Sequence, residues 1–143
     1  MRMGEILKAK DNQDVVTITP DADVRELIAT LAQHNIGALV VSTDGVALDG
    51  IVSERDVVRH LHHDGTVINN TVSAIMTTTV QTCSPEDDLD EVMATMTQRR
   101  FRHIPVVEGG QVIGIVSIGD VVKHKIGQLE FERDQLDGYI NQA

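Results

Sequence analysis

The sequence predicts an α/β (α+β) fold in which two copies of a β-α-β-β-α unit pack through their sheets about a pseudo-twofold axis, followed by a C-terminal helix. Three observations lead to this prediction. The chain of 143 residues matches itself at a shift of 65 positions, β-branched extended segments alternate with segments of helical apolar spacing, and the strands between the helices are almost continuously apolar. Continuously apolar strands are expected where both faces of a sheet are covered.

The internal repeat covers most of the chain. Two motifs carry it: Thr-x-x-Pro occurs at residues 17–20 and 82–85, and Gly-Ile-Val-Ser-x-x-Asp occurs at residues 50–56 and 114–120. The shift changes from 65 to 64 between the two motifs, at predicted hairpin turns, where insertions cost little. We expect a first repeat at residues 5–65, a linker at 66–74, a second repeat at 75–127 and a C-terminal amphipathic helix at 128–143.

A short strand and then a helix are predicted at the start of each repeat. The strands, at residues 15–18 and 80–82, are rich in β-branched residues and are followed by a proline, which keeps the residue before it extended. In each helix, apolar residues at i, i+3, i+4 and i+7 form one stripe that faces the core. The stripes consist of Val24, Leu27, Ile28 and Leu31 in the first repeat and of Leu89, Val92, Met93 and Met96 in the second.

A hairpin and a second helix complete each repeat. The hairpin strands are predicted at residues 38–41 and 50–52, and at 104–107 and 112–116. A unit of about 60 residues buries too little surface to stand alone, so the two copies are expected to form one body with two equivalent clefts between them. Met3, Ile6 and Leu7 predict a further short helix at the N-terminus.

The C-terminal segment contains a heptad-like seam. Its members follow one another at spacings of three, four or seven residues: Val122, Ile126, Leu129, Leu136 and Ile140. Because about two and a half heptads cannot hold a coiled coil alone, the seam either packs on the repeats or joins a second chain. We favour the second alternative, a homodimer.

The charge balance excludes several classes of partner. Twelve basic and 22 acidic side chains give a net charge of −10, which repels phosphate backbones and anionic lipid surfaces. Aromatic residues make up 2% of the chain and tryptophan is absent, so a base-stacking platform is not expected. No apolar run approaches the length of a membrane span. The sequence therefore predicts a cytoplasmic protein that binds neither nucleic acid nor membranes.

Cysteine and histidine residues give little indication of chemistry. Cys83 is the only cysteine, so an intramolecular disulfide is impossible, and we expect a buried, inert thiol. His60 and Asp64 are spaced to share a helix face, but no third metal ligand is apparent, and histidines also favour helix C-termini for electrostatic reasons. We therefore predict no metal site.

The repeated Ser-x-x-Asp element allows two interpretations. Ser53 with Asp56, and Ser117 with Asp120, match a capping box at a helix start. Alternatively, the helix N-terminus offers free N–H groups to a phosphate, while the aspartate accepts hydrogen bonds from ribose hydroxyls. The two roles compete for the same carboxylate atoms.

Basic residues cluster at one place in this acidic chain. Arg99 and Arg100 are expected at the end of a helix, where cations are favourable, whereas Arg102 and His103 lead into a strand. In the first repeat Gly37 and Ala38 take the positions of Arg102 and His103. Arg55, inside the first Ser-x-x-Asp element, is either a phosphate contact or a solvated charge.

Taken together, the two Gly-Ile-Val-Ser-x-x-Asp motifs and Phe101-Arg102-His103-Ile104-Pro105-Val106-Val107 resemble a tandem pair of cystathionine-beta-synthase (CBS) domains, also called a Bateman module, over residues 5–127. The resemblance implies an adenine-nucleotide ligand in the clefts between the repeats, such as AMP, ADP, ATP, an NAD-type dinucleotide or S-adenosylmethionine. It implies no catalytic residue and no obligatory cofactor.

The same resemblance implies roles for individual residues. Asp56 and Asp120 would contact ribose, Ser53 and Ser117 would lie near the phosphates, and Arg102 and His103 would bind phosphate. Ile104, Pro105, Thr17 and Thr82 would border the adenine, and Ala38 occupies the position that matches His103. Because Gly37 and Ala38 replace the basic pair, the first repeat's cleft is expected to lack it, so the two clefts should differ in affinity or in ligand.

The predicted function is that of a non-catalytic sensor module whose nucleotide occupancy is read by an unidentified protein partner, in trans. The main alternative is a structural homodimeric adaptor with unoccupied clefts. An enzyme is disfavoured because no catalytic triad order, phosphate-binding glycine loop or metal cage is present in the sequence.

Overall fold

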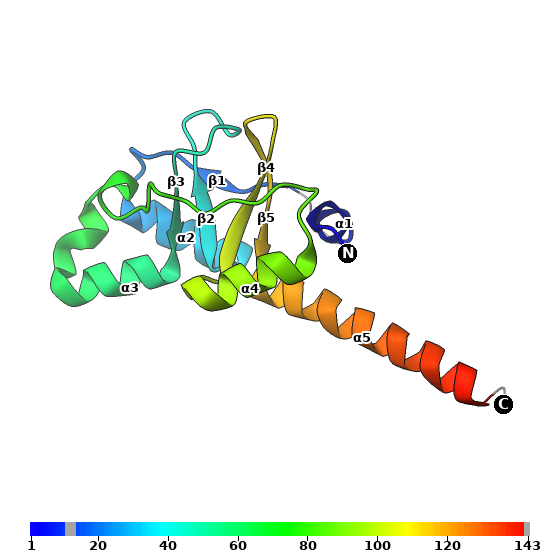
Figure 1. Cartoon of the computed structure of the whole chain (residues 1–143). Coiled ribbons are helices and arrows are strands. Elements are labelled where there is room, and N and C mark those ends of the chain that lie inside the picture. Colours follow the sequence, from blue (N-terminus) through cyan, green and yellow to red (C-terminus); the bar gives the residue numbers. More distant parts are fainter. Residues whose placement is uncertain (11–13, 142–143) are drawn as a thin grey trace.

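The computed structural model describes residues 1–10 and 14–141, and its elements follow the predicted repeat (Figure 1). The first repeat contains β1 (Thr17–Ile18), α2 (Val24–His34), β2 (Ala38–Val41), β3 (Gly50–Ser53) and α3 (Glu54–His63). The second contains α4 (Leu89–Arg99), β4 (His103–Glu108), β5 (Gln111–Ser117) and α5 (Ile118–Asn141). The remaining elements are α1 (Met3–Lys8) and the 3-10 turns η1 (Gly65–Asn69) and η2 (Val72–Ala74).

The strands form two small sheets. In the first sheet β1 pairs in parallel with β2, and β2 pairs antiparallel with β3. The second sheet is the antiparallel hairpin of β4 and β5, in which His103 lies opposite Ser117. Ala38 lies opposite Ser53 in the first hairpin, so the two hairpins have matching registers at this end.

The strand predicted at residues 80–82 does not form. Only Cys83 pairs with β4: its N–H donates to Pro105 O, and its carbonyl accepts from Val107 N. A parallel ladder would next need an N–H from Pro105, which proline lacks. The first repeat has Val40 at the matching position, and there β1 extends over two residues.

Each repeat is completed by a segment from outside it. The core of the second repeat includes Met3 and Ile6 of α1, and the core of the first includes Val72 and Ile75 around η2. Matching backbone bonds hold both segments: Met3 N donates to Asp87 O over 2.9 Å, and Val72 N donates to Ala22 O over 2.8 Å. The segment predicted as a linker therefore carries core residues of the first repeat.

We call these two segments, α1 and η2 with the residues that follow them, the exchanged segments. A glycine lies where each exchanged segment crosses a strand. A Cβ atom on Gly50 would lie 2.8 Å from the carbonyl oxygen of Thr77, and one on Gly114 would lie 2.5 Å from the side chain of Leu7. Both distances are shorter than van der Waals contact, so a side chain at Gly50 would displace the backbone of its segment, and one at Gly114 would force Leu7 to another position.

The C-terminal helix is not a separate element as predicted. Residues 118–141 form one helix, α5, which begins in the second repeat and then projects away from the molecule (Figure 1). Lys125 pairs with Asp90 of α4 over 2.9 Å near its start. Beyond this pair the apolar seam is exposed, with 51% of Leu129 and 62% of Leu136 accessible. Residues 142–143 of the predicted helix lie outside the described part of the chain.

No helix in the described residues combines the length and the apolar character that crossing a bilayer would require.

Candidate functional site

A cavity of about 700 Å³ lies between the two repeats. The first repeat contributes the start of β2, the end of β3 and the first turn and a half of α3, and the second contributes the residues between α4 and β4. The connecting residues 77–81 supply the third wall. Six of the residues predicted to bind a ligand line this cavity: Ala38, Ser53, Arg55, Asp56, Arg102 and His103.

The start of α3 forms the capping box that the sequence predicts, and one carboxylate oxygen remains available. Asp56 N donates to Ser53 Oγ over 3.2 Å, while Asp56 Oδ2 accepts from Ser53 N over 2.8 Å and from Ser53 Oγ over 3.0 Å. Among the described residues, Asp56 Oδ1 has no hydrogen-bond partner. Capping therefore occupies one oxygen of this carboxylate and leaves the other unoccupied.

Five of the eight arginines of the chain line this one cavity: Arg55, Arg59, Arg99, Arg100 and Arg102. Within residues 1–10 and 14–141, none of their guanidinium groups forms a hydrogen bond or an ion pair with another residue. Such a concentration of unpaired positive charge in an acidic protein favours an anion, because guanidinium groups bind phosphate or carboxylate oxygens bidentately.

The end of α4 holds Arg100 in an unusual backbone conformation. Arg100 is the C-cap of α4 and has a φ of 59°, in the left-handed region, where the matching position of the first repeat has Asn35 with a φ of 52°. Asparagine tolerates this conformation better than arginine does, and the cost is about 1 kcal/mol. Arg99 and Arg100 end the helix as predicted, and in addition they line the cavity.

His103 lies where the two repeats meet. A Cβ atom on Gly37 would be 3.2 Å from the imidazole of His103, so the ring packs directly on the first repeat. Burial lowers the pKa of His103 below its ordinary value, although the carboxylates of Glu54 and Asp120 oppose the shift. The ring is therefore neutral near pH 7 and acts there as a hydrogen-bonding group.

We expect protonation of His103 to destabilise the protein. Because its pKa is lower in the folded state than the unfolded value of about 6.5, the unfolded chain binds the proton more readily. The free energy of unfolding should therefore fall as the pH drops below about 6.5. Urea unfolding at several pH values between 5 and 8 measures this dependence. The free energy of unfolding should change less with pH for His103→Gln than for the control His34→Gln, which removes an exposed histidine. The same pH dependence in both variants would contradict a destabilising protonation of His103.

The expectation that the first repeat's cleft lacks the basic pair is corrected by the geometry. Arg102 and His103 line the cavity together with Ser53 and Asp56, not with the Ser-x-x-Asp element of their own repeat. The reason is the pseudo-twofold arrangement: the start of β4 meets the start of β2 across the interface, so each repeat presents this position to its neighbour.

The second Ser-x-x-Asp element has the same cap but a different environment. Ser117 N donates to Asp120 Oδ2 over 2.9 Å, and Asp120 N donates to Ser117 Oγ over 3.1 Å. Lys10 Nζ lies 3.1 Å from Asp120 Oδ2. Burial alone would raise the pKa of Asp120, but the hydrogen bonds from Ser117 and Lys10 hold it below its ordinary value.

The four residues expected to border the adenine do not line this cavity. Ile104 is 1% exposed and packs in the core of the second repeat, away from the lining of this cavity. Pro105 is buried in β4, and Thr17 and Thr82 are half-buried near the sheet edges. These three residues, like Ser117 and Asp120, lie outside the cavity lining.

Sequence reasoning missed several lining residues. Phe101 is half-buried and supplies an aromatic face, and Arg59 lies one helical turn after Arg55. The i, i+4 spacing of the two arginines could have indicated a shared face of α3. The others, in the connecting segment, are Thr77, Thr79, Val80 and Gln81. No motif marks them, since they depend on the path of the chain between the repeats.

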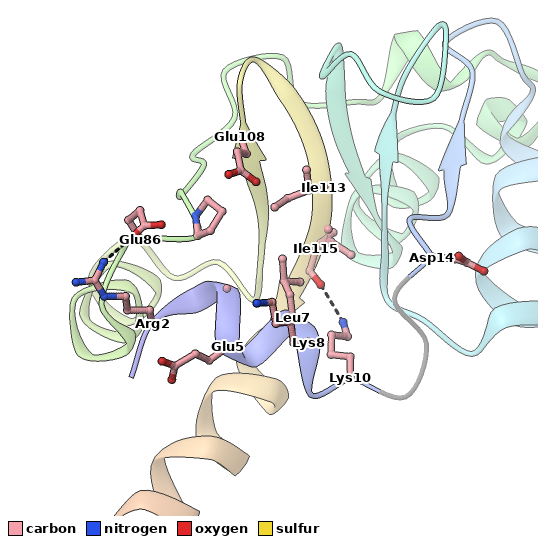
Figure 2. A pocket seen from close by; sticks show the side chains of 13 residues that line it. Arg2, Glu5, Leu7, Lys8, Lys10, Asp14, Glu86, Glu108, Ile113 and Ile115 are labelled. Atoms are coloured by element: carbon pink, nitrogen blue, oxygen red, sulfur yellow. Dashed lines mark hydrogen bonds and ion pairs between the residues drawn. The ribbon is translucent and has the colours of Figure 1, made fainter.

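A second hollow of about 440 Å³ lies between α1 and β5 (Figure 2). Its walls carry both charges, and Arg2 pairs with Glu86 across it. Lys10 lies at one end, where its side chain reaches the carbonyl oxygen of Ile115 (Figure 2).

The lone cysteine is buried, as expected. Cys83 is 6% exposed in the core of the second repeat, and burial, together with the charge of Asp87, raises the pKa of its thiol to about 12. The thiol is therefore protonated at neutral pH and is a poor nucleophile. Among the described residues, no group of three or more histidine, cysteine, aspartate or glutamate side chains is placed to hold a metal ion.

Known proteins share this architecture. The chain is 40% identical over 127 residues to the mitochondrial CBS domain-containing protein CBSX3 of Arabidopsis thaliana, covering 85% of this chain and 62% of the relative. It therefore spans less than two thirds of that protein. The crystal structure of the CBS-domain containing protein ATU1752 from Agrobacterium tumefaciens matches with a TM-score of 0.83 and 40% identity, over 87% of this chain and 99% of that one.

A further solved structure was determined with ligands. It is the CBS domain pair of protein MJ0100 in complex with 5′-methylthioadenosine and S-adenosyl-L-methionine, with a TM-score of 0.79 and 25% identity, over 90% of this chain and 98% of that one. The family model for the CBS domain matches residues 4–63 and again residues 72–127. The chain therefore belongs to the CBS-domain family and contains two CBS domains arranged as a pair.

Proposed function

We propose that this CBS pair is a non-catalytic sensor module that binds an adenine nucleotide, of the AMP, ADP, ATP or NAD type, and signals in trans to a protein partner. The nucleotide occupies the 700 Å³ cavity between the repeats. The observation that carries the proposal is the coincidence, in this cavity, of five unpaired arginines with the available carboxylate oxygen of Asp56.

The two groups fit the two ends of a nucleotide. The arginines supply positive charge for phosphate oxygens, and the Asp56 carboxylate accepts hydrogen bonds from ribose hydroxyls. Phe101 and Val80 offer apolar contact to a base. The MJ0100 structure was determined with adenosine-containing ligands that carry no phosphate, whereas the arginines of this chain favour ligands that do.

Thermal unfolding with a panel of ligands tests the proposal. A ligand at about 100 times its dissociation constant stabilises the fold by roughly 2.7 kcal/mol. We expect AMP, ADP, ATP or NAD to raise the melting temperature more than 5′-methylthioadenosine or S-adenosylmethionine does, and added salt to reduce the shift. Inorganic phosphate serves as the control for charge alone. The absence of a shift with every nucleotide would contradict the proposal.

The exposed seam of α5 favours one second candidate, a structural homodimeric adaptor. Ile126, Leu129 and Leu136 are more than half exposed, and pairing with the same helix of a second copy would cover them. Light scattering at increasing concentration measures the association. Dimers that form without any nucleotide-dependent shift in melting temperature would favour the adaptor over the sensor.

A further inference from the structure

Lys10 takes part in two contacts, of which the ion pair has no parallel in the first repeat. Its ammonium group lies 3.1 Å from Asp120 Oδ2 and donates to the carbonyl oxygen of Ile115 over 2.8 Å (Figure 2). Asp120 and Ile115 match Asp56 and Ile51 at the shift of 64, and both of these line the cavity of the first repeat. Ile51 O accepts from Thr77 N, so at Ile115 the ammonium group takes the place of a backbone donor. At Asp120 it lies where the first repeat has the cavity lined by Asp56.

Aligning the two exchanged segments by their backbone hydrogen bonds shows which residue of the first repeat corresponds to Lys10. Met3 and Val72 make the same backbone bond in the two repeats, as do Gly4 and Ser73, which sets a shift of 69. At this shift Lys10 corresponds to Thr79, because 10 plus 69 is 79. Thr79 lines the same cavity as Asp56, and its short side chain carries no charge that could pair with the carboxylate.

We infer that Lys10 closes the second cleft, so that the chain binds one nucleotide, in the first cleft, and not two. The inference rests on the function proposed above and adds its stoichiometry. The Lys10 side chain is 26% exposed and that of Asp120 is 27% exposed, so the pair is largely shielded from water. As at Asp56, Oδ1 of Asp120 has no hydrogen-bond partner among the described residues, because Lys10 and the cap both use Oδ2. A ribose at Asp120 would nevertheless have to enter beside a largely shielded ammonium group that already neutralises this carboxylate.

The reverse situation holds at Asp56. No cation pairs with this carboxylate among the described residues, although five arginines line the same cavity. A ribose hydroxyl can therefore approach Oδ1 without breaking an existing ion pair. The difference between the clefts follows from a single pair of matched positions, lysine at 10 and threonine at 79.

Isothermal titration with AMP tests the inference. Wild-type protein should bind one AMP per chain, and Lys10→Ala should bind two, because the second carboxylate becomes available. The matched control is Lys8→Ala, which removes the same charge from α1 and should still bind one. The reciprocal variant Thr79→Lys should bind none, since it places an ammonium group beside Asp56.

The outcomes separate this inference from the proposed function. Two sites in the wild type, or one site in both the wild type and Lys10→Ala, would overturn the role of Lys10 while leaving nucleotide binding intact. Binding to Lys10→Ala alone would support the role of Lys10 and overturn the first cleft as the natural site. No binding of AMP, ADP, ATP or NAD to either protein would overturn both proposals.

Discussion

Replacement of Ile6 by alanine is expected to lower the free energy of unfolding by about 2–5 kcal/mol. Ile6 belongs to α1, a helix of six residues near the N-terminus, where shortening a side chain usually has little effect on stability. Its side chain is completely buried in the core of the second repeat, next to Met3 and far along the chain from its neighbours in that core. The loss therefore combines the transfer term of the side chain with the cost of a cavity.

Urea unfolding followed by circular dichroism measures this loss. Ile28→Ala is the matched control, because Ile28 is also a helical isoleucine but is 37% exposed, and it should cost much less. Ile75→Ala, the counterpart of Ile6 in the other exchanged segment, should cost about as much as Ile6→Ala. If Ile6→Ala behaves like the Ile28 variant, α1 does not pack in the second repeat.

Asp56→Ala is expected to weaken binding of the preferred nucleotide about ten- to hundredfold. The substitution removes a charged acceptor from the cavity while leaving the five arginines in place. It also removes the N3 residue of a capping box, so part of any effect could reflect a weaker α3. The binding measurement must therefore separate these two effects.

Asp120→Ala supplies that separation. It removes the same capping interaction from the start of α5, but from a carboxylate outside the cavity. Because it also removes the ion pair to Lys10, we expect it to lower stability at least as much as Asp56→Ala does and to leave the affinity for nucleotide unchanged. Titration of both variants with the same nucleotide, with circular dichroism to check folding, decides the question. Equal losses of affinity in the two variants would refute the ribose role of Asp56.

The helices and hairpins of this fold could be predicted because their patterns are local. The apolar stripe of Val24, Leu27 and Leu31 and the Ser53 capping box depend on neighbours within a few residues, and both are present in the structure. The duplication then doubled each pattern, so the order of elements and the family resemblance could be read from the sequence with only small changes in the bounds.

The exchange of segments and the composition of the cavity could not be predicted in this way. Met3 and Ile6 indicate a helix, but nothing in a six-residue pattern states that it belongs to the second repeat. Arg102 and His103 were assigned to their own Ser-x-x-Asp element because they precede it in the chain, whereas the interface brings them to Asp56. Both errors concern partners that are distant in sequence, for which local periodicity carries no information.

The absence of a strand at residues 80–82 could have been expected from Pro105, which β-propensity alone does not take into account. Residues 80–82 are good strand formers, but pairing depends on the donors of the neighbouring strand, and Pro105 has none to offer. Val80 and Gln81 of the predicted strand instead line the cavity.

The reciprocal placement of α1 and η2 has a consequence for assembly. A single unit with its own N-terminal segment cannot fill its own core, because that segment fits only the other copy. Two separate units would satisfy both cores by trading segments, which is the arrangement of a domain-swapped dimer. This chain contains the equivalent of such a dimer within one polypeptide. Because the two repeats are covalently connected, the exchange of segments is intramolecular and does not depend on protein concentration. The two repeats can therefore also differ in sequence.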